Sequence, residues 1–135
     1  MKTSEVHYKG DLRTDAIHLK SGEKIVTDAP VDNQGKGEAF SPTDLAATSL
    51  AACMITTVGI MARNKNITIE KMDAEVLKVM ASNPRRISEI HVDLQVKVSP
   101  DNSVVRNQVM DTAINCPVAK SLHPDIRQEV NFNFL

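Results

Sequence analysis

Tryptophan is absent from this 135-residue chain, and aromatic residues make up only 3% of it. A folded core must therefore be built from aliphatic side chains, methionine and alanine. The shortage of aromatic residues for base stacking and the formal net charge of -1 give no attraction to nucleic acid or to an acidic membrane surface. We therefore expect neither a nucleic-acid partner nor a membrane partner.

Cysteine is also scarce, because the chain has only Cys53 and Cys116. The N-terminal residues lack the apolar stretch of a secretory signal, so we expect a cytoplasmic protein. In that reducing compartment a thiol pair is more often catalytic or redox-sensing than a structural disulfide. The four histidines show no metal-ligand spacing with each other or with the cysteines, and we expect no metal and no cofactor.

Charged residues are missing from residues 45–62, a run of 18. That length is at the lower edge of the roughly 17–25 residues that a membrane-spanning helix needs. The run is rich in alanine, carries several threonines and Gly59, and is bounded tightly by Asp44 and Arg63. We interpret it as the buried helix of a soluble protein.

Helix-start signals stand just before this run. Ser41 suits the N-cap, Pro42 the first helical position, and Asp44 completes a capping-box pattern. The helix should then run to about Asn64. Apolar residues occur around most of its circumference, so it needs burial on nearly every face, which a chain of this size hardly supplies alone. This pattern predicts a homodimer in which two such helices share one core.

The whole chain, residues 1–135, is close to the usual size of one domain, and its pattern of strands, helix, strands, helix and strand predicts an α+β fold. Residues 32–40 predict a loop, and residues 83–86 the turn of a hairpin. The predicted strands are 6–10, 15–22, 24–30, 67–82, 88–99 and 126–135, and the other predicted helices are 99–115 and 117–123.

The two thiols differ in their local settings. A cysteine reacts as the thiolate, so a reactive one needs a group that lowers its pKa. Cys53 lies mid-helix and would need a cation supplied by the fold, whereas Cys116 stands before Pro117 at a helix N-terminus, where thiolates are favoured. Local physics alone therefore predicts Cys116 as the more acidic thiol. The alternative for Cys53 is a small core residue like its alanine neighbours.

Two motifs carry a resemblance to a known family. SPTDLAATSLAACM around Cys53 and NCPVAKSL around Cys116 resemble the motifs of the OsmC and organic hydroperoxide resistance (Ohr) family, and TDAP before the glycine-containing loop agrees with it. The resemblance implies an intertwined homodimer with antiparallel sheets packed on a long, central, cysteine-bearing helix. It also implies a cofactor-free thiol peroxidase that reduces organic hydroperoxides at the expense of a dithiol.

The resemblance also implies roles for individual residues. Cys53 corresponds to the thiol that attacks the peroxide, and Cys116 to the resolving thiol. Arg13 corresponds to the arginine that holds the thiolate, although a solvated turn residue is the alternative. Many members carry a glutamate that pairs with this arginine, but Thr43 stands at that position here. Asp44 and Glu38 are the candidates to replace it, and the capping box already gives Asp44 a structural explanation.

Two other functions stay open from the sequence. In one, Cys53 is a neutral core thiol, and the same fold binds a lipid-like or thiol-bearing ligand. In the other, the protein is a redox sensor or thiol-transfer protein in which Cys116 reacts first. The pKa of Cys53 discriminates the first alternative, and the identity of the first oxidised sulfur discriminates the second.

Overall fold

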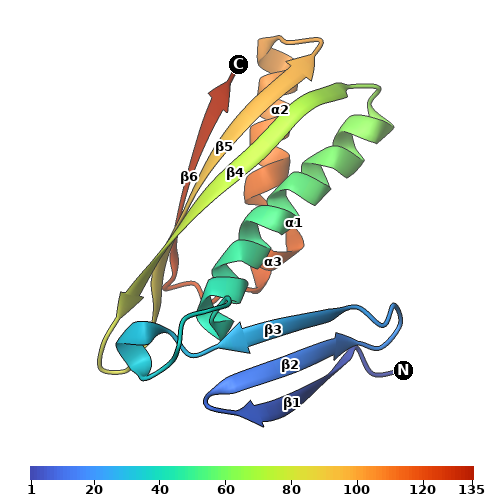
Figure 1. Ribbon diagram of the computed structural model, residues 1–135. Helices are drawn as coiled ribbons and strands as arrows, with labels where there is room; N and C mark the ends of the chain where they lie inside the picture. The colour runs from blue at the N-terminus through green and yellow to red at the C-terminus, as the bar shows by residue number, and fades with distance from the viewer. The chain divides into compact units, whose positions relative to one another are not determined.

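The computed structural model describes all residues from 1 to 135 and divides into two compact units, Met1–Ala46 and Ala47–Leu135. The first unit is a three-stranded antiparallel sheet followed by one turn of 3-10 helix (Figure 1). All three strands were predicted, whereas the 3-10 turn lies where only a loop was expected. The elements are β1 (Ser4–Gly10), β2 (Arg13–His18), β3 (Lys24–Asp28) and η1 (Val31–Asn33).

The sheet of the first unit has no apolar core of its own. The buried residues of the first unit are Thr27 and Asp28 of β3 and Ser41 before α1, and all three are polar. Strand register places Val6, Tyr8 and Ile25 on one face, where they stay 63%, 69% and 48% exposed. Successive residues of a strand point to opposite faces, so Asp28, next to Thr27, belongs to the other face. One side of the sheet is therefore an exposed apolar surface.

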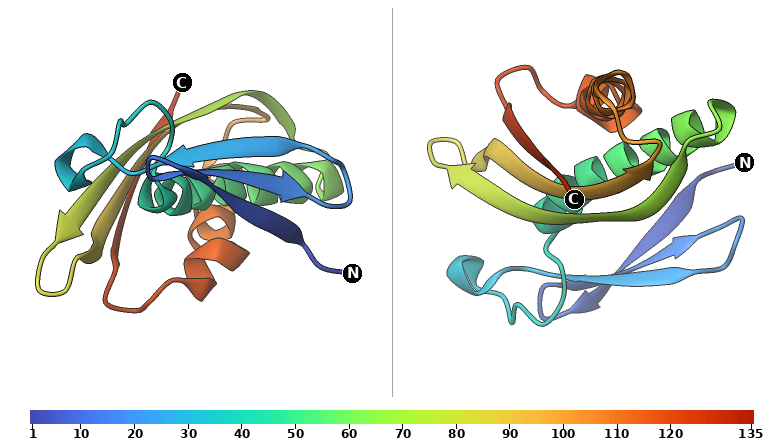
Figure 2. Two further views of the ribbon diagram at one scale, coloured as in Figure 1. Left: turned by 60° about the horizontal axis from the view of Figure 1, so that its bottom comes forward. Right: turned by 90° about the horizontal axis from the view of Figure 1, so that it is seen from above.

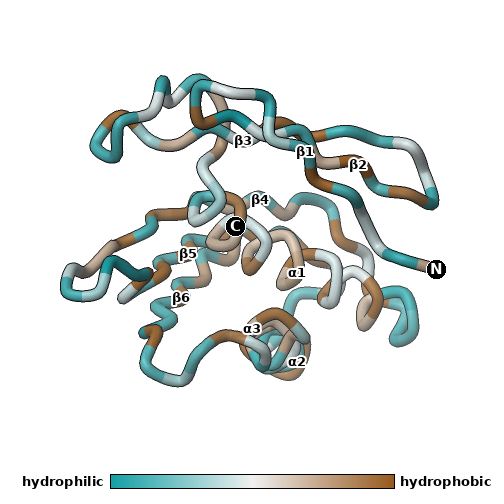
Figure 3. Tube along the Cα trace, turned by 90° about the horizontal axis from the view of Figure 1, so that it is seen from below, coloured by the Kyte–Doolittle hydropathy of each residue, from teal (hydrophilic) through white to brown (hydrophobic).

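The long helix α1 (Pro42–Asn64) begins and ends where the sequence predicts. The capping box at its start is confirmed: the Ser41 backbone N–H donates to the Asp44 carboxylate, and the Asp44 N–H donates to the Ser41 hydroxyl, both at 3.0 Å. By length and composition α1 could also cross a membrane, as the core helices of soluble proteins often could. Figure 3 shows mostly white to brown colours along it, which mark residues of intermediate to high hydropathy.

Within this chain α1 buries a stripe rather than nearly every face. The buried residues recur at three- and four-residue spacing, as a helix packed on one side requires. Ile60 on the opposite side is 57% exposed. The stripe consists of Ala47, Leu50, Ala51, Met54, Val58 and Ala62.

The second unit packs α1 and α2 (Ser103–Ile114) on the same face of a three-stranded sheet (Figure 2). The sheet consists of β4 (Thr68–Ala81), β5 (Arg86–Ser99) and β6 (Arg127–Phe134) in that order. Alternate residues of β5 are buried against the helices: Ile90, Val92, Leu94, Val96 and Val98.

One expectation about the sheets is wrong. Strands β4 and β5 form the predicted antiparallel hairpin, but β6 pairs with β5 in parallel. A parallel pair needs a crossover connection, and α2 with the short helix α3 (Pro117–Ser121) supplies it between the two strands. The fold is α+β with two sheets, as predicted, but the second sheet is mixed.

Candidate active site

The two thiols of the second unit lie together. Cys53 is half-buried in α1, and Cys116 is fully buried at the N-cap of α3, with Pro117 at the first helical position. Both are free thiols, and each shifts the pKa of the other, so the two side chains are neighbours. The crossover after β5 thus returns the chain to the middle of α1 and joins two residues that are far apart in sequence.

The surroundings of Cys53 favour its thiolate. Burial by itself raises the pKa of Cys53, but three donors outweigh it: the Val118 backbone N–H, the Cys116 thiol and the Thr57 hydroxyl. The resulting pKa lies below the ordinary value of a cysteine. All three donors are neutral and belong to the second unit. The cation that the sequence predicted beside this thiol is therefore not needed to lower its pKa.

The opposite holds for Cys116, so the prediction from local physics is wrong. Burial raises the pKa of Cys116, and the neighbouring Cys53 sulfur raises it further, against weaker help from the Ala119 and Val118 backbone N–H groups. The N–H groups at the helix start lower the pKa of Cys116, as expected, but they form no cap hydrogen bond with its side chain, and burial of the thiol outweighs them. Cys116 therefore keeps its proton to a higher pH than Cys53 does, and its thiol is one of the groups that favour the Cys53 thiolate.

Thr57 stands one helical turn after Cys53 and touches it twice. Its hydroxyl donates to the Cys53 carbonyl oxygen at 2.7 Å, and its Oγ1 lies 3.8 Å from the Cys53 Sγ. A hydroxyl has one proton and two acceptor positions. It can therefore accept from a neutral Cys53 thiol or turn its proton toward the thiolate. No sequence motif marked Thr57, although its position four residues after the cysteine on a helix places both side chains on one face.

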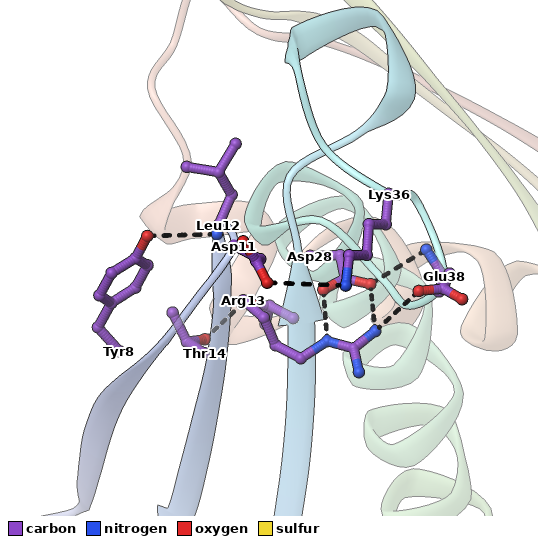
Figure 4. A network of polar contacts seen from close by, with 9 residues as sticks. Tyr8, Asp11, Leu12, Arg13, Thr14, Asp28, Lys36 and Glu38 are labelled. Atoms are coloured by element: carbon purple, nitrogen blue, oxygen red, sulfur yellow. Dashed lines mark hydrogen bonds and ion pairs between the residues drawn. The ribbon is translucent and has the colours of Figure 1, made fainter.

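In the first unit, Arg13 starts β2 and pairs with a buried carboxylate (Figure 4). Its Nε and Nη2 each donate to Asp28 at 2.7 Å, and Nη2 lies 3.5 Å from the Glu38 carboxylate. The Arg13 hydrogen bond and charge lower the pKa of Asp28 despite its burial, and Asp28 raises that of Arg13 in turn. Arg13 is thus a fixed, permanently charged group and not a solvated turn residue.

Sequence reasoning missed Asp28, although it belongs to the TDAP segment. The signal that would have found it is strand register, because Arg13 and Asp28 are directly opposite in the β2–β3 hairpin. Of the two predicted partners for Arg13, Glu38 is at its side. Asp44 forms the capping box with Ser41. Arg13 belongs to one unit and Cys53 to the other, so a contact between them stays a prediction.

Comparison with known proteins identifies the family. The sequence profile of the family described as OsmC-like protein matches residues 35–131, and the chain belongs to that family. No match was found among curated proteins.

Solved structures agree with this assignment. A protein of Psychrobacter arcticus 273-4, named as a candidate osmotic stress induced and detoxification response protein, is 57% identical, with a TM-score of 0.92 over 98% of this chain and 96% of that chain. An OsmC-like protein of Mycoplasma pneumoniae is 23% identical, with a TM-score of 0.79 over 100% and 98% of the two chains. An organic hydroperoxide resistance protein OsmC of Legionella pneumophila is 17% identical, with a TM-score of 0.72 over 96% and 94%. The last two show the shared fold.

Proposed function

We propose that this protein is a cysteine-based peroxidase that reduces organic hydroperoxides in the cytoplasm. The observation that carries the proposal is the division of roles in the thiol pair. The pKa of Cys53 is lowered by neutral donors, whereas burial and the neighbouring sulfur raise the pKa of Cys116. A nucleophilic thiolate beside a protonated thiol is the arrangement that peroxide reduction followed by disulfide formation requires.

The reaction balances with one hydroperoxide and one dithiol. The Cys53 thiolate attacks the distal peroxide oxygen, the O–O bond breaks, and the departing alkoxide takes a proton from water to give the alcohol. Cys53 is then a sulfenic acid, with which the Cys116 thiol condenses to a disulfide and water. A dithiol reductant exchanges with the disulfide and restores both thiols. Arg13 would orient the hydroperoxide and stabilise the developing negative charge.

The first test replaces each cysteine separately. Wild-type protein with a dithiol should consume cumene hydroperoxide or tert-butyl hydroperoxide, and Cys53→Ser should abolish this. Cys116→Ser should complete one turnover and then over-oxidise at Cys53, visible by mass spectrometry as a sulfinic or sulfonic acid. Undiminished peroxide consumption by Cys53→Ser would overturn the proposal. The raised pKa of Cys116 speaks against a sensor in which that thiol reacts first.

The proposed working form is a homodimer. Two surfaces support it: the apolar face of the first sheet, where Val6, Tyr8 and Ile25 are exposed, and the side of α1 that carries the exposed Ile60. Apolar patches of this kind commonly mark interfaces. Analytical ultracentrifugation should give twice the mass of the chain. Tyr8→Glu and Ile25→Glu should weaken the dimer, whereas Lys9→Glu, a charge change on the polar face, should not. A monomeric wild-type protein would contradict this part.

A further inference from the structure

Asp28 is a buried carboxylate in a unit that buries only two other residues, Thr27 and Ser41. It is 1% exposed, in a sheet whose apolar side chains are open to solvent. Burying an ionised carboxylate is costly unless it is paired and hydrogen-bonded. Asp28 has three donors: Nε and Nη2 of Arg13, and the backbone N–H of Glu38 at 3.1 Å. Its negative charge is therefore kept, and two of its three hydrogen bonds come from Arg13.

The geometry of this pair fixes the orientation of the Arg13 guanidinium. Two parallel N–H···O bonds hold the planar group in one plane and at one rotation, which a single ionic contact does not do. They use Nε and Nη2, and Nη1 donates no hydrogen bond within the protein. Arg13 is 37% exposed. The two N–H groups of Nη1 are therefore available to donate to a ligand, and Asp28 fixes their direction.

Glu38 is the lesser partner. Its carboxylate is 62% exposed and 3.5 Å from Nη2, so solvent screens the pair, and such exposed ion pairs contribute little. Its backbone N–H matters more, because it ties the segment that follows η1 to the same buried carboxylate. The loop and the arginine thus share one anchor, which is Asp28.

From these contacts we infer that Asp28 is the positioning residue of the reaction, which holds Arg13 so that its Nη1 edge is presented to the peroxide oxygens. This inference rests on the proposed peroxidase function. It assigns to Asp28, on β3, the task of holding the arginine, and leaves Glu38 secondary. Asp28 itself does not touch the substrate.

The test separates positioning from a merely structural role. Asp28→Asn keeps the shape but removes the charge and replaces one of the two acceptor oxygens by a donor NH2 group, and Glu38→Gln is the matched control. We expect Asp28→Asn to lose about tenfold or more in kcat/KM for cumene hydroperoxide, as expected for a displaced catalytic group, and Glu38→Gln to stay within about twofold. Asp28→Glu should recover part of the loss. Because Asp28 acts through Arg13, adding Asp28→Asn to Arg13→Ala should cost nothing further.

Additive losses in the double variant would overturn the inference, and so would equal losses in Asp28→Asn and Glu38→Gln. A second readout needs no peroxide: the ¹⁵N–¹H spectrum of the arginine Nε–H groups, with Arg13 assigned by its absence in Arg13→Lys. Wild-type Arg13 should give a slowly exchanging Nε–H signal that Asp28→Asn loses and Glu38→Gln keeps. If the wild type consumes no hydroperoxide, the proposed function fails, while this spectrum still tests the positioning. A rapidly exchanging wild-type signal overturns the inference by itself.

Discussion

The two units hold their reactive groups by opposite means. In the first unit, Arg13 is a permanent, partly exposed charge, and another charge, the buried Asp28 carboxylate, holds it. In the second unit, Cys53 lies against an aliphatic core, and only neutral donors surround it. The difference follows from what each group does. A guanidinium is always charged, so the protein has only to fix its orientation. A reactive thiol has to lose and regain its proton during the reaction.

This contrast explains why the second unit contains no cation beside the thiol. A fixed positive charge would acidify both sulfurs, because Coulomb interactions reach beyond one atom. Hydrogen bonds are directional, so the donors that converge on Cys53 lower its pKa while Cys116 remains protonated. The fold thereby gives the two neighbouring thiols different pKa values, and no cationic side chain is among the groups that shift them.

The largest expected effect is the selectivity between the two thiols. The thiolate fraction of Cys53 persists down to its lowered pKa and is lost as pH falls through that value, whereas Cys116 ionises only above the ordinary range. Iodoacetamide at neutral pH should therefore label Cys53 at least about tenfold faster than Cys116. Peptide mass spectrometry after short exposures measures both rates. Equal labelling, or faster labelling of Cys116, would reverse the assignment of the two thiols.

A smaller effect is expected when Arg13 keeps its charge but loses its planar fork. Arg13→Lys cannot make the two parallel bonds to Asp28, so its charge is no longer aimed. We expect kcat/KM for cumene hydroperoxide to fall by about tenfold. The alkylation rate of Cys53 should stay close to that of the wild type, because neutral donors in its own unit set its pKa. A matching fall in both rates would show that the two units do not divide the work in this way.

Features that depend only on a short segment could be predicted from the sequence. The bounds of α1 followed from local rules, since Ser41, Pro42 and Asp44 are capping residues whose preferences do not depend on the rest of the fold. The alternating burial of β5 followed in the same way from its residue pattern. Both are properties of a short segment and its own side chains.

The acidity of the thiols could not be predicted in this way. It depends on which donors from the crossover reach Cys53 and on how deeply Cys116 is buried, and both are tertiary facts. The partner of Arg13 was missed for a related reason. The candidates Asp44 and Glu38 were chosen for their positions near the start of α1, whereas the partner on the neighbouring strand, Asp28, is identified only by the hairpin register. The parallel pairing of β6 likewise depends on the path of the crossover.

The smallest effect concerns the weakest of the three donors to Cys53. Thr57→Val keeps the branched shape but removes the hydroxyl, which should raise the pKa of Cys53, because that hydroxyl helps to stabilise the thiolate. A typical net hydrogen bond of roughly 1 kcal/mol corresponds to about fivefold slower alkylation of Cys53 at neutral pH. Thr57→Ser, which restores the hydroxyl, should recover the wild-type rate.

Thr56 offers the matched control for this substitution. It is the preceding residue of α1, and its side chain is exposed. Thr56→Val therefore makes the same chemical change to the helix away from the sulfur, and we expect no change in the alkylation rate. If Thr56→Val and Thr57→Val slow the reaction equally, the effect belongs to the helix as a whole. The lowered pKa of Cys53 would then depend on the Val118 N–H and the Cys116 thiol, without a contribution from Thr57.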